Sequence, residues 1–251
     1  MNRALPRPTA LGLTAVVFDL DGVVTRTATV HAAAWAALFD GYLQERAART
    51  GEPFRPFDRG TDYTAWVDGK PRYDGVAAFL ESRGIRLPWG DPADPPEADT
   101  VCGLGNRKNA LFHEALAREP VEVFPGARRF INACRDAGLA CALCSSSKNA
   151  RAVLEKAGLT ALFDAVVDGV HAAEHHLPGK PAPDTFLAAA RMVGAEPSRA
   201  AVVEDAVVGV EAGRAGDFAL VIGIDRGAGA DALLRHGADI VVTDLGEFER
   251  V

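Results

Sequence analysis

The chain has 251 residues, of which 48% are apolar and 24% are charged, and its formal net charge is −7. A chain of this length forms one large domain or a main domain with a smaller partner, and it can bury a core without disulfides. The excess of acidic residues argues against nucleic acid or an anionic membrane surface as a partner. No stretch approaches the roughly 20 apolar residues of a membrane span, so no membrane partner is expected.

The four cysteines do not suggest a disulfide framework. Cys141 and Cys144 form a C-x-x-C pair, but they lie in an apolar run that is typical of a buried strand. Residues three apart on a strand point to opposite faces, so these two thiols would not share a metal ion. Reduced cysteines and the lack of a recognisable signal peptide favour the cytoplasm. We predict a cytoplasmic monomer.

Six short apolar runs are spaced along the chain, at residues 15–18, 139–144, 165–167, 200–203, 218–222 and 239–242. They are continuous rather than alternating, which indicates parallel strands buried on both faces. Amphipathic helical patterns cover residues 126–137, 149–157 and 184–193, and a glycine follows each of them. This alternation predicts an α/β fold with a doubly wound, parallel, Rossmann-like sheet. Sites in such sheets lie beyond the carboxyl ends of the strands.

The segment between the first two runs has a different character. An alanine-rich helical pattern covers residues 27–48, further helical patterns cover 75–83 and 107–118, and residues 91–99 form an acidic, proline-rich surface loop. We interpret this segment as a helical cap domain inserted into the sheet domain. The predicted boundaries are residues 1–27 and 122–251 for the catalytic core and residues 28–121 for the cap.

Two carboxylates follow the first predicted strand directly: Asp19 and Asp21, with Gly22 next. At this spacing they can converge in a loop, where one can act as a nucleophile and metal ligand and the other as a general acid or base. Carboxylate oxygens also suit a hard cation such as Mg²⁺. A simple turn explains the D-x-D-G run equally well, whereas a calcium-binding EF-hand would need further oxygen ligands that the following residues do not supply.

A serine cluster, residues 145–147, follows the second predicted strand, just before a helix opened by Lys148 and Asn149. A hydroxyl such as that of Ser145, together with backbone N–H groups at a helix N-terminus, can bind phosphate. Ser147 serves equally well as an ordinary N-cap.

Further charged groups complete the pattern. Lys180 lies in a loop made rigid by prolines on either side, where it can neutralise a phosphoryl group. Glu204 and Asp205 follow a fourth predicted strand, and adjacent buried acids are costly without a cation. Each group alone has an ordinary structural explanation, but their shared position at strand ends or in a rigid loop favours a single site.

These groups match the four motifs of the haloacid dehalogenase-like phosphotransferase superfamily, which the chain resembles in both the sheet and the insertion. The matching positions are residues 19–25 (D-L-D-G-V-V-T), Ser145, Lys180 and residues 203–205 (V-E-D). The resemblance implies that Asp19 is a nucleophile forming an aspartyl-phosphate, that Asp21 is the general acid or base, and that Ser145 and Lys180 hold the phosphoryl group. The implied Mg²⁺ ligands are Asp19, Asp21 through its backbone carbonyl, Glu204 and Asp205.

Within this superfamily the chain is most similar to the β-phosphoglucomutases, whose H-x-x-x-W, G-x-x-R, R-K-N and S-x-S-K-N patterns match residues 31–35, 69–72, 107–109 and 145–149. The implied substrate-binding residues are His31, Trp35, Arg72, Lys108, Asn109, Ser147, Lys148 and Asn149. Arg72 would grip the distal phosphate of the substrate. On their own, the cap cations Arg72 and Lys108 are better explained as solvated surface charges, whereas a helix-face histidine explains His31 equally well.

Two features depart from that group. Arg26 stands between Thr25 and Thr27, where the group has an aspartate, and this bears on cap closure and on mutase versus phosphatase behaviour. Residues 41–68 have no clear counterpart, which indicates a cap of different shape.

We therefore predict a Mg²⁺-dependent phosphotransferase that isomerises a hexose 1-phosphate through a bisphosphate intermediate, with a sugar phosphate as its partner. A sugar-phosphate phosphatase is the alternative, in which water discharges the same aspartyl-phosphate. A non-catalytic sugar-phosphate-binding domain would have lost the nucleophile or a metal-binding acid. Asp19, Asp21, Lys180, Glu204 and Asp205 are all present.

Overall fold

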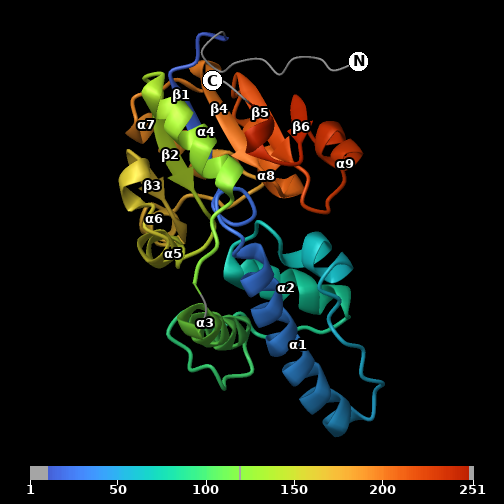
Figure 1. Ribbon diagram of the computed structural model, residues 1–251. Coiled ribbons are helices and arrows are strands. Elements are labelled where there is room, and N and C mark those ends of the chain that lie inside the picture. Colours follow the sequence, from blue (N-terminus) through green and yellow to red (C-terminus); the bar gives the residue numbers. More distant parts are fainter. Residues whose placement is uncertain (1–10, 119, 249–251) are drawn as a thin grey trace. The chain divides into compact units, whose positions relative to one another are not determined.

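The computed structural model describes residues 11–118 and 120–248, and the chain divides into two compact units (Figure 1). The first unit comprises the described parts of Met1–Arg26 and Val121–Val251, and the second is Thr27–Pro120. None of the helices in the described ranges combines the length and hydropathy that a membrane span needs.

The first unit is built on a parallel sheet that, over the described residues, has six strands in the order β3-β2-β1-β4-β5-β6. The strands are β1 (Ala15–Phe18), β2 (Ala140–Cys144), β3 (Ala165–Val167), β4 (Ala200–Glu204), β5 (Leu220–Ile224) and β6 (Ile240–Val242). Val17 of β1 lies opposite Ala142 of β2 on one side and Val202 of β4 on the other. The predicted parallel, doubly wound sheet is confirmed, and β1 lies between β2 and β4 with all four of its residues buried.

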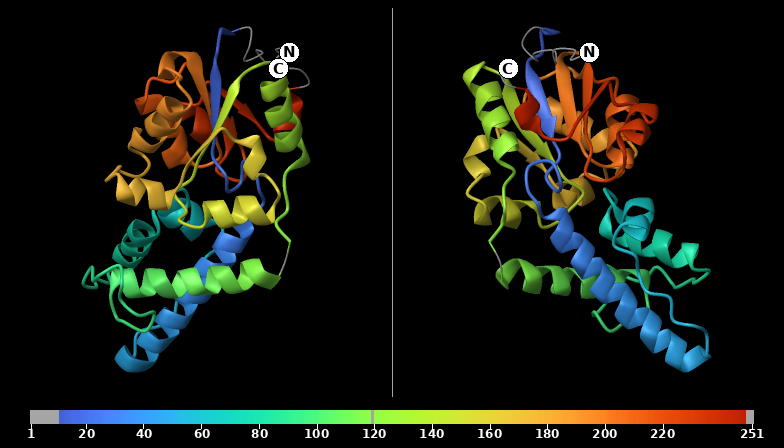
Figure 2. Two further views of the ribbon diagram at one scale, coloured as in Figure 1. Left: turned by 90° about the vertical axis from the view of Figure 1, so that its left-hand side faces the viewer. Right: turned by 45° about the vertical axis from the view of Figure 1, so that its right-hand side comes forward.

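Helices cover both faces of this sheet, as the left view of Figure 2 shows. They are α4 (Pro125–Asp136), α5 (Ala150–Lys156), α6 (Gly169–Glu174), α7 (Asp184–Met192), α8 (Val207–Ala215) and α9 (Ala230–Arg235). On one face, Val17 packs in a cluster with Phe186 of α7 and Val210 of α8. On the other face, Phe130 of α4 meets Phe18 edge-on, with ring centroids 6.1 Å apart.

Three of these helices, α6, α8 and α9, are not predicted from the sequence. Helices α6 and α9 have only six residues each, which is too short for a helical period to stand out. In α8 two glycines weaken the pattern. Gly213 is needed there because a β-carbon would press against Val202 and Val221, so the helix packs directly on the sheet.

The second unit is helical, with α1 (Ala28–Thr50), a π-helical turn η2 (Tyr63–Val67), α2 (Arg72–Ser82) and α3 (Val101–Arg118). Its core is aromatic: the Phe39 ring lies 5.2 Å from Trp35 and 4.0 Å from Phe79. Helix α3 begins six residues earlier than predicted, because the Thr100 hydroxyl accepts a hydrogen bond from the Gly103 N–H and caps the first turn.

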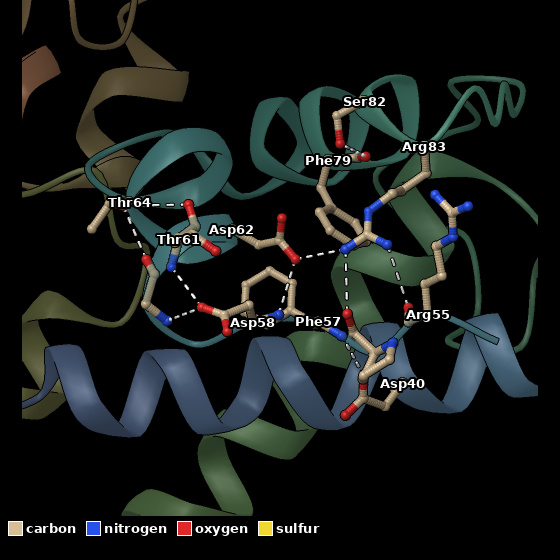
Figure 3. Close-up of polar contacts among 12 residues, drawn as sticks. Asp40, Arg55, Phe57, Asp58, Thr61, Asp62, Thr64, Phe79, Ser82 and Arg83 are labelled. Atoms are coloured by element: carbon tan, nitrogen blue, oxygen red, sulfur yellow. Dashed lines mark hydrogen bonds and ion pairs between the residues drawn. The ribbon is translucent and has the colours of Figure 1, made fainter.

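Residues 41–68, for which the sequence analysis identifies no clear counterpart, complete α1, form a loop that folds back on the same core and include η2 (Figure 3). The Phe57 N–H donates to Asp40 of α1 at 2.7 Å, and the Phe57 ring lies 5.1 Å from Phe79. Arg83 donates to Asp62 at 2.6 Å and to the Arg55 carbonyl at 3.4 Å. These contacts give the loop a structural role in the second unit.

Candidate active site

Asp19 and Lys180 are 161 residues apart in the chain and form a buried ion pair beyond the sheet. Asp19 directly follows β1, and its N–H donates to the Val203 carbonyl at 2.9 Å, which extends the pairing of β1 with β4. Lys180 Nζ lies 2.5 Å from Asp19 Oδ1 and 2.5 Å from Glu204 Oε1. The three side chains are almost fully buried, so this cluster lies in the interior of the unit and is not a surface ion pair.

Burial sets the protonation balance of this cluster. It raises the pKa of the Asp19 carboxyl well above its ordinary value, against the opposing effect of Lys180, and the charges of Glu204 and Asp21 raise it further. Burial alone would lower the pKa of Lys180, but the carboxylates of Asp19 and Glu204 outweigh it and raise that pKa. The lysine is therefore held in its charged form among more carboxylates than it can neutralise.

The adjacent acids Glu204 and Asp205 face different neighbours. Glu204 Oε1 accepts from Lys180, and its Oε2 accepts from the Ala206 N–H at 2.7 Å. The Asp205 carboxylate instead lies against Gly22, where a β-carbon would overlap it. Consecutive side chains at the end of a strand point in opposite directions. Glu204 therefore contacts Lys180, whereas Asp205 contacts the loop of the first motif.

The first-motif loop turns tightly after Asp19. The Gly22 N–H donates to the Thr25 carbonyl at 2.8 Å, and the N–H groups of Val24 and Thr25 both donate to the Leu20 carbonyl at 2.9 Å. Gly22 adopts φ +89°, a conformation that side chains rarely take. The turn brings Asp21 close enough to Asp19 for its charge to raise the pKa of the Asp19 carboxyl.

In the serine cluster, side-chain hydroxyl oxygens accept hydrogen bonds from backbone N–H groups of the same turn. Ser145 is buried, its N–H donates to the Val167 carbonyl at 2.9 Å, and its Oγ accepts from the Ser147 N–H at 3.1 Å. The Ser147 Oγ in turn accepts from the Asn149 N–H at 3.1 Å, and Lys148 lies in the same turn before α5. Ser147 therefore stabilises the turn before α5, but it is not the N-cap that the sequence offered as an alternative, because Asn149 occupies that position.

The sequence analysis missed two residues that lie close to Lys180. The Phe186 ring lies 4.8 Å from Lys180 Nζ, and the charges of Lys180 and Asp19 both act on the Cys144 thiol. Burial raises the pKa of Cys144 to about 11, so this thiol stays protonated beside the buried ion pair. The only sequence signal for either was its short distance from a motif residue.

In the second unit the structure brings His31 and Lys108 together, 77 residues apart in the chain. Lys108 Nζ lies 2.7 Å from His31 Nδ1, and both side chains are buried. The ammonium also lies 4.8 Å from the Trp35 ring. Three of the predicted substrate-binding residues thus form one cluster, while Asn109 follows Lys108 on α3.

Arg72, at the start of α2, has a buried guanidinium nitrogen, Nη1, with no hydrogen-bond partner among the described residues. Burial lowers the pKa of Arg72, and the guanidinium lies 5.3 Å from the Tyr73 ring. An arginine in an ordinary solvated position would have neither feature. Its unused donor suits an anionic group such as phosphate.

Among the described residues, no three histidine, cysteine, aspartate or glutamate side chains form a cluster that could hold a metal ion. Mg²⁺ in phosphate-handling enzymes is usually held by only one or two carboxylates together with water and substrate oxygens. The residues beside β1 and β4 offer that smaller donor set.

Comparisons with known proteins agree with this geometry. A family model described as haloacid dehalogenase-like hydrolase matches residues 13–217. A β-phosphoglucomutase of Mycobacterium tuberculosis (strain CDC 1551 / Oshkosh) is 55% identical over 93% of this chain and 90% of its own length. A β-phosphoglucomutase of Bacillus subtilis (strain 168) is 32% identical over 93% of this chain and 94% of its own length.

A crystal structure of β-phosphoglucomutase from Clostridium difficile has the same fold, with a TM-score of 0.74 and 24% identity over 94% of this chain and 92% of that chain. The matched residues include the buried cluster of Asp19, Lys180 and Glu204. On these matches, and with its acids and lysine gathered at the carboxyl edge of the parallel sheet, the chain belongs to the haloacid dehalogenase-like hydrolase family and is an enzyme of that family.

Proposed function

We propose that the protein is a Mg²⁺-dependent phosphotransferase that interconverts hexose phosphates in the manner of a β-phosphoglucomutase. The observation that carries the proposal is the buried Asp19–Lys180–Glu204 cluster, with two contacts of 2.5 Å to one ammonium group. The 55% identity to a β-phosphoglucomutase over almost the whole of both chains favours a mutase within this family.

In the proposed reaction an oxygen of the Asp19 carboxylate attacks the phosphorus of a phosphorylated donor. The bond from phosphorus to the donor oxygen breaks, and Asp21 gives that oxygen a proton. The phosphoryl group then passes from Asp19 to a hydroxyl of the hexose phosphate, whose proton returns to Asp21. The resulting bisphosphate turns around and gives its other phosphoryl group back to Asp19.

Lys180 supports the transfer by charge and position. Its ammonium, held by Asp19 and Glu204, lies where negative charge builds up on the phosphoryl oxygens. We propose that the Ser145 hydroxyl completes this phosphate site. Because Lys180 is buried and paired on two sides, it needs no rearrangement when the phosphoryl group arrives.

The residues fit a bound Mg²⁺. The carboxylates of Asp19 and Glu204 share the one ammonium of Lys180, and the charge of Asp21 also acts on Asp19, so the acids outnumber the cation. We propose that Asp19, the backbone carbonyl of Asp21 and Asp205 hold the ion. Glu204, predicted from the resemblance as a further ligand, instead accepts hydrogen bonds from Lys180 and from the Ala206 N–H through its two oxygens, and its role is to hold the lysine. When bound, the ion would withdraw charge from the phosphoryl oxygens.

In this proposal, residues of the second unit bind the substrate. Arg72 binds the distal phosphate, because its buried Nη1 has a free donor and a guanidinium can make two parallel hydrogen bonds to phosphate. The buried His31–Lys108 pair contributes a second cation and a sugar contact. The mutase reaction requires the bisphosphate to turn around, so that each of its two phosphoryl groups reacts with Asp19 in turn.

A turnover screen tests the proposal. The wild-type protein is incubated with α- and β-anomers of several hexose 1-phosphates, Mg²⁺ and a catalytic amount of the matching bisphosphate, and both isomer and free phosphate are measured. Isomer in large excess over free phosphate is the expected result. Free phosphate without isomer would replace the mutase by a sugar-phosphate phosphatase, and neither product would refute both.

A further inference from the structure

Arg226, just after β5, connects three segments that meet at the carboxyl edge of the sheet. Its Nε donates to the Gly22 carbonyl at 2.8 Å, and its Nη1 donates to the Thr243 carbonyl at 2.8 Å. The guanidinium lies 3.8 Å from the centre of the Phe124 ring. A partly exposed arginine that makes three such contacts at once is held in one geometry, unlike most surface arginines.

Phe124 and Gly22 belong to the two chain segments that leave the first unit. These segments are tied to each other: the Phe124 N–H donates to the Val24 carbonyl at 3.0 Å, and the Arg26 N–H donates to the Glu122 carbonyl at 2.9 Å. Arg26 also lies 4.4 Å from the Phe124 ring. The Phe124 ring therefore contacts two guanidinium groups, that of Arg26 in the first of the tied segments and that of Arg226 after β5.

The Gly22 carbonyl is an informative place for an arginine to bind. Gly22 directly follows Asp21, its N–H closes the first-motif turn, and its α-carbon is in contact with the Asp205 carboxylate. A shift of this peptide would move Asp21 and Asp205 together. Burial lowers the pKa of Arg226 and the carboxylates of Asp205 and Asp244 act against it, so the cation also lies close to the acids of the site.

We propose that Arg226 is a positioning residue for the transfer reaction, which anchors the Gly22 peptide and thereby fixes Asp21 and Asp205 relative to Asp19. The inference rests on the proposed function, and it adds a residue outside the four motifs. The planar guanidinium is required because one side chain must reach two carbonyls in different loops and cover the Phe124 ring. A lysine has a single donor centre and cannot reproduce that arrangement.

Arg214 provides a matched control in the same unit. Its Nε and Nη2 donate to the Gly237 carbonyl at 3.0 and 2.7 Å, and it pairs with Asp239. It is thus an arginine that holds a loop carbonyl, like Arg226, but it contacts neither the first-motif loop nor Phe124. Loss of Arg214 reports the cost of removing a loop-holding arginine without disturbing the acids.

The experiment compares R226A, R226K and R214A with the wild type in three measurements: kcat and KM for the hexose phosphate, thermal midpoint, and amide hydrogen exchange. In R226A we expect kcat to fall roughly 10- to 100-fold, as for a displacement of reacting groups by about 1 Å, with KM changed less than about three-fold. R226K should recover little of this loss. R214A should lower the thermal midpoint about as much as R226A and leave kcat unchanged.

Amide hydrogen exchange tests the anchoring role of Arg226 independently of the proposed function. The amides of Gly22, Val24 and Thr25, which close the first-motif turn, should exchange faster in R226A and at the wild-type rate in R214A. If the wild type turns over no sugar phosphate, the proposed function fails while this measurement still tests the anchoring. Unchanged exchange at these amides, or a kcat equal to that of R214A, would overturn the role given to Arg226.

Discussion

The Asp205 carboxylate lies directly against the α-carbon of Gly22, so that any side chain at Gly22 would overlap Asp205 Oδ2. This contact joins the first and last motifs of the candidate site, which are 183 positions apart in the numbering. It also explains why a glycine follows Asp21: the backbone there has a positive φ of +89°, and there is no room for a β-carbon.

The first prediction concerns this contact. Gly22→Ala should reduce turnover at least about 100-fold, because the methyl group must displace the Asp205 carboxylate or the Asp21 peptide. Gly138→Ala is the control: its φ is +80°, but nothing lies within 4 Å of the added carbon. Both variants should lose about 1 kcal/mol of unfolding free energy to the strained backbone. Equal kinetics in the two variants would contradict a functional role for the contact.

The second prediction concerns the nucleophile. Asp19→Asn should abolish turnover while the protein remains folded, because an amide is a poor nucleophile. Its thermal midpoint should stay close to that of the wild type, since burial already disfavours the charged Asp19 carboxylate and Lys180 keeps Glu204 as a partner. Kinetics and calorimetry on one preparation, with deamidation checked by mass spectrometry, provide the measurement. Wild-type rates would remove Asp19 from the mechanism.

The third prediction separates the adjacent acids. Asp205→Ala should raise the Mg²⁺ concentration needed for half-maximal activity more than Glu204→Ala does, with little loss of stability. Glu204→Ala should lower the unfolding free energy by about 3 kcal/mol, because it leaves the buried Lys180 with one carboxylate fewer. Mg²⁺ titrations, apo-protein melting curves and activity in excess chelator are the measurements. Full activity in chelator would contradict the Mg²⁺ assignment.

The fourth prediction distinguishes mutase from phosphatase chemistry. Arg72→Ala should slow isomerisation of a hexose 1-phosphate by at least about ten-fold, since a charge-assisted hydrogen bond contributes about 1.5–3 kcal/mol. Hydrolysis of a small substrate with one phosphate should barely change. Stability should not fall, because Nη1 is buried without a partner among the described residues.

Arg86→Ala, which removes an exposed arginine from the same unit, is the control for general charge effects. An equal loss of both rates in Arg72→Ala would assign Arg72 to folding, and no loss of either would leave the distal phosphate without its proposed partner. Arg72→Lys, which keeps the charge but not the planar fork, should restore only part of the isomerisation rate.

The sequence by itself predicts the sheet and the place of the site, for a local physical reason. Runs such as 15–18 and 200–203 are short and apolar without alternation, which is typical of a strand buried on both faces. Parallel strands end at a common edge, so the sequence predicts Asp19 and the acids at 204–205 at the same edge of the sheet. That β1 and β4 are neighbours is decided by the tertiary structure. The six-residue helices α6 and α9 carry too few periods for such reasoning, and two glycines interrupt the pattern of α8.

The partners of each side chain, in contrast, are decided by the tertiary structure. No local pattern distinguishes Glu204, which binds Lys180, from Asp205, which lies against Gly22. The pairing of His31 with Lys108, the unused donor of Arg72 and the anchoring of the Gly22 carbonyl by Arg226 likewise depend on segments far apart in the chain. Hydrogen bonds and carboxylate contacts depend on distances of a few tenths of an ångström. Those distances exist only once the helices and strands have packed, because packing sets the direction in which each side chain points.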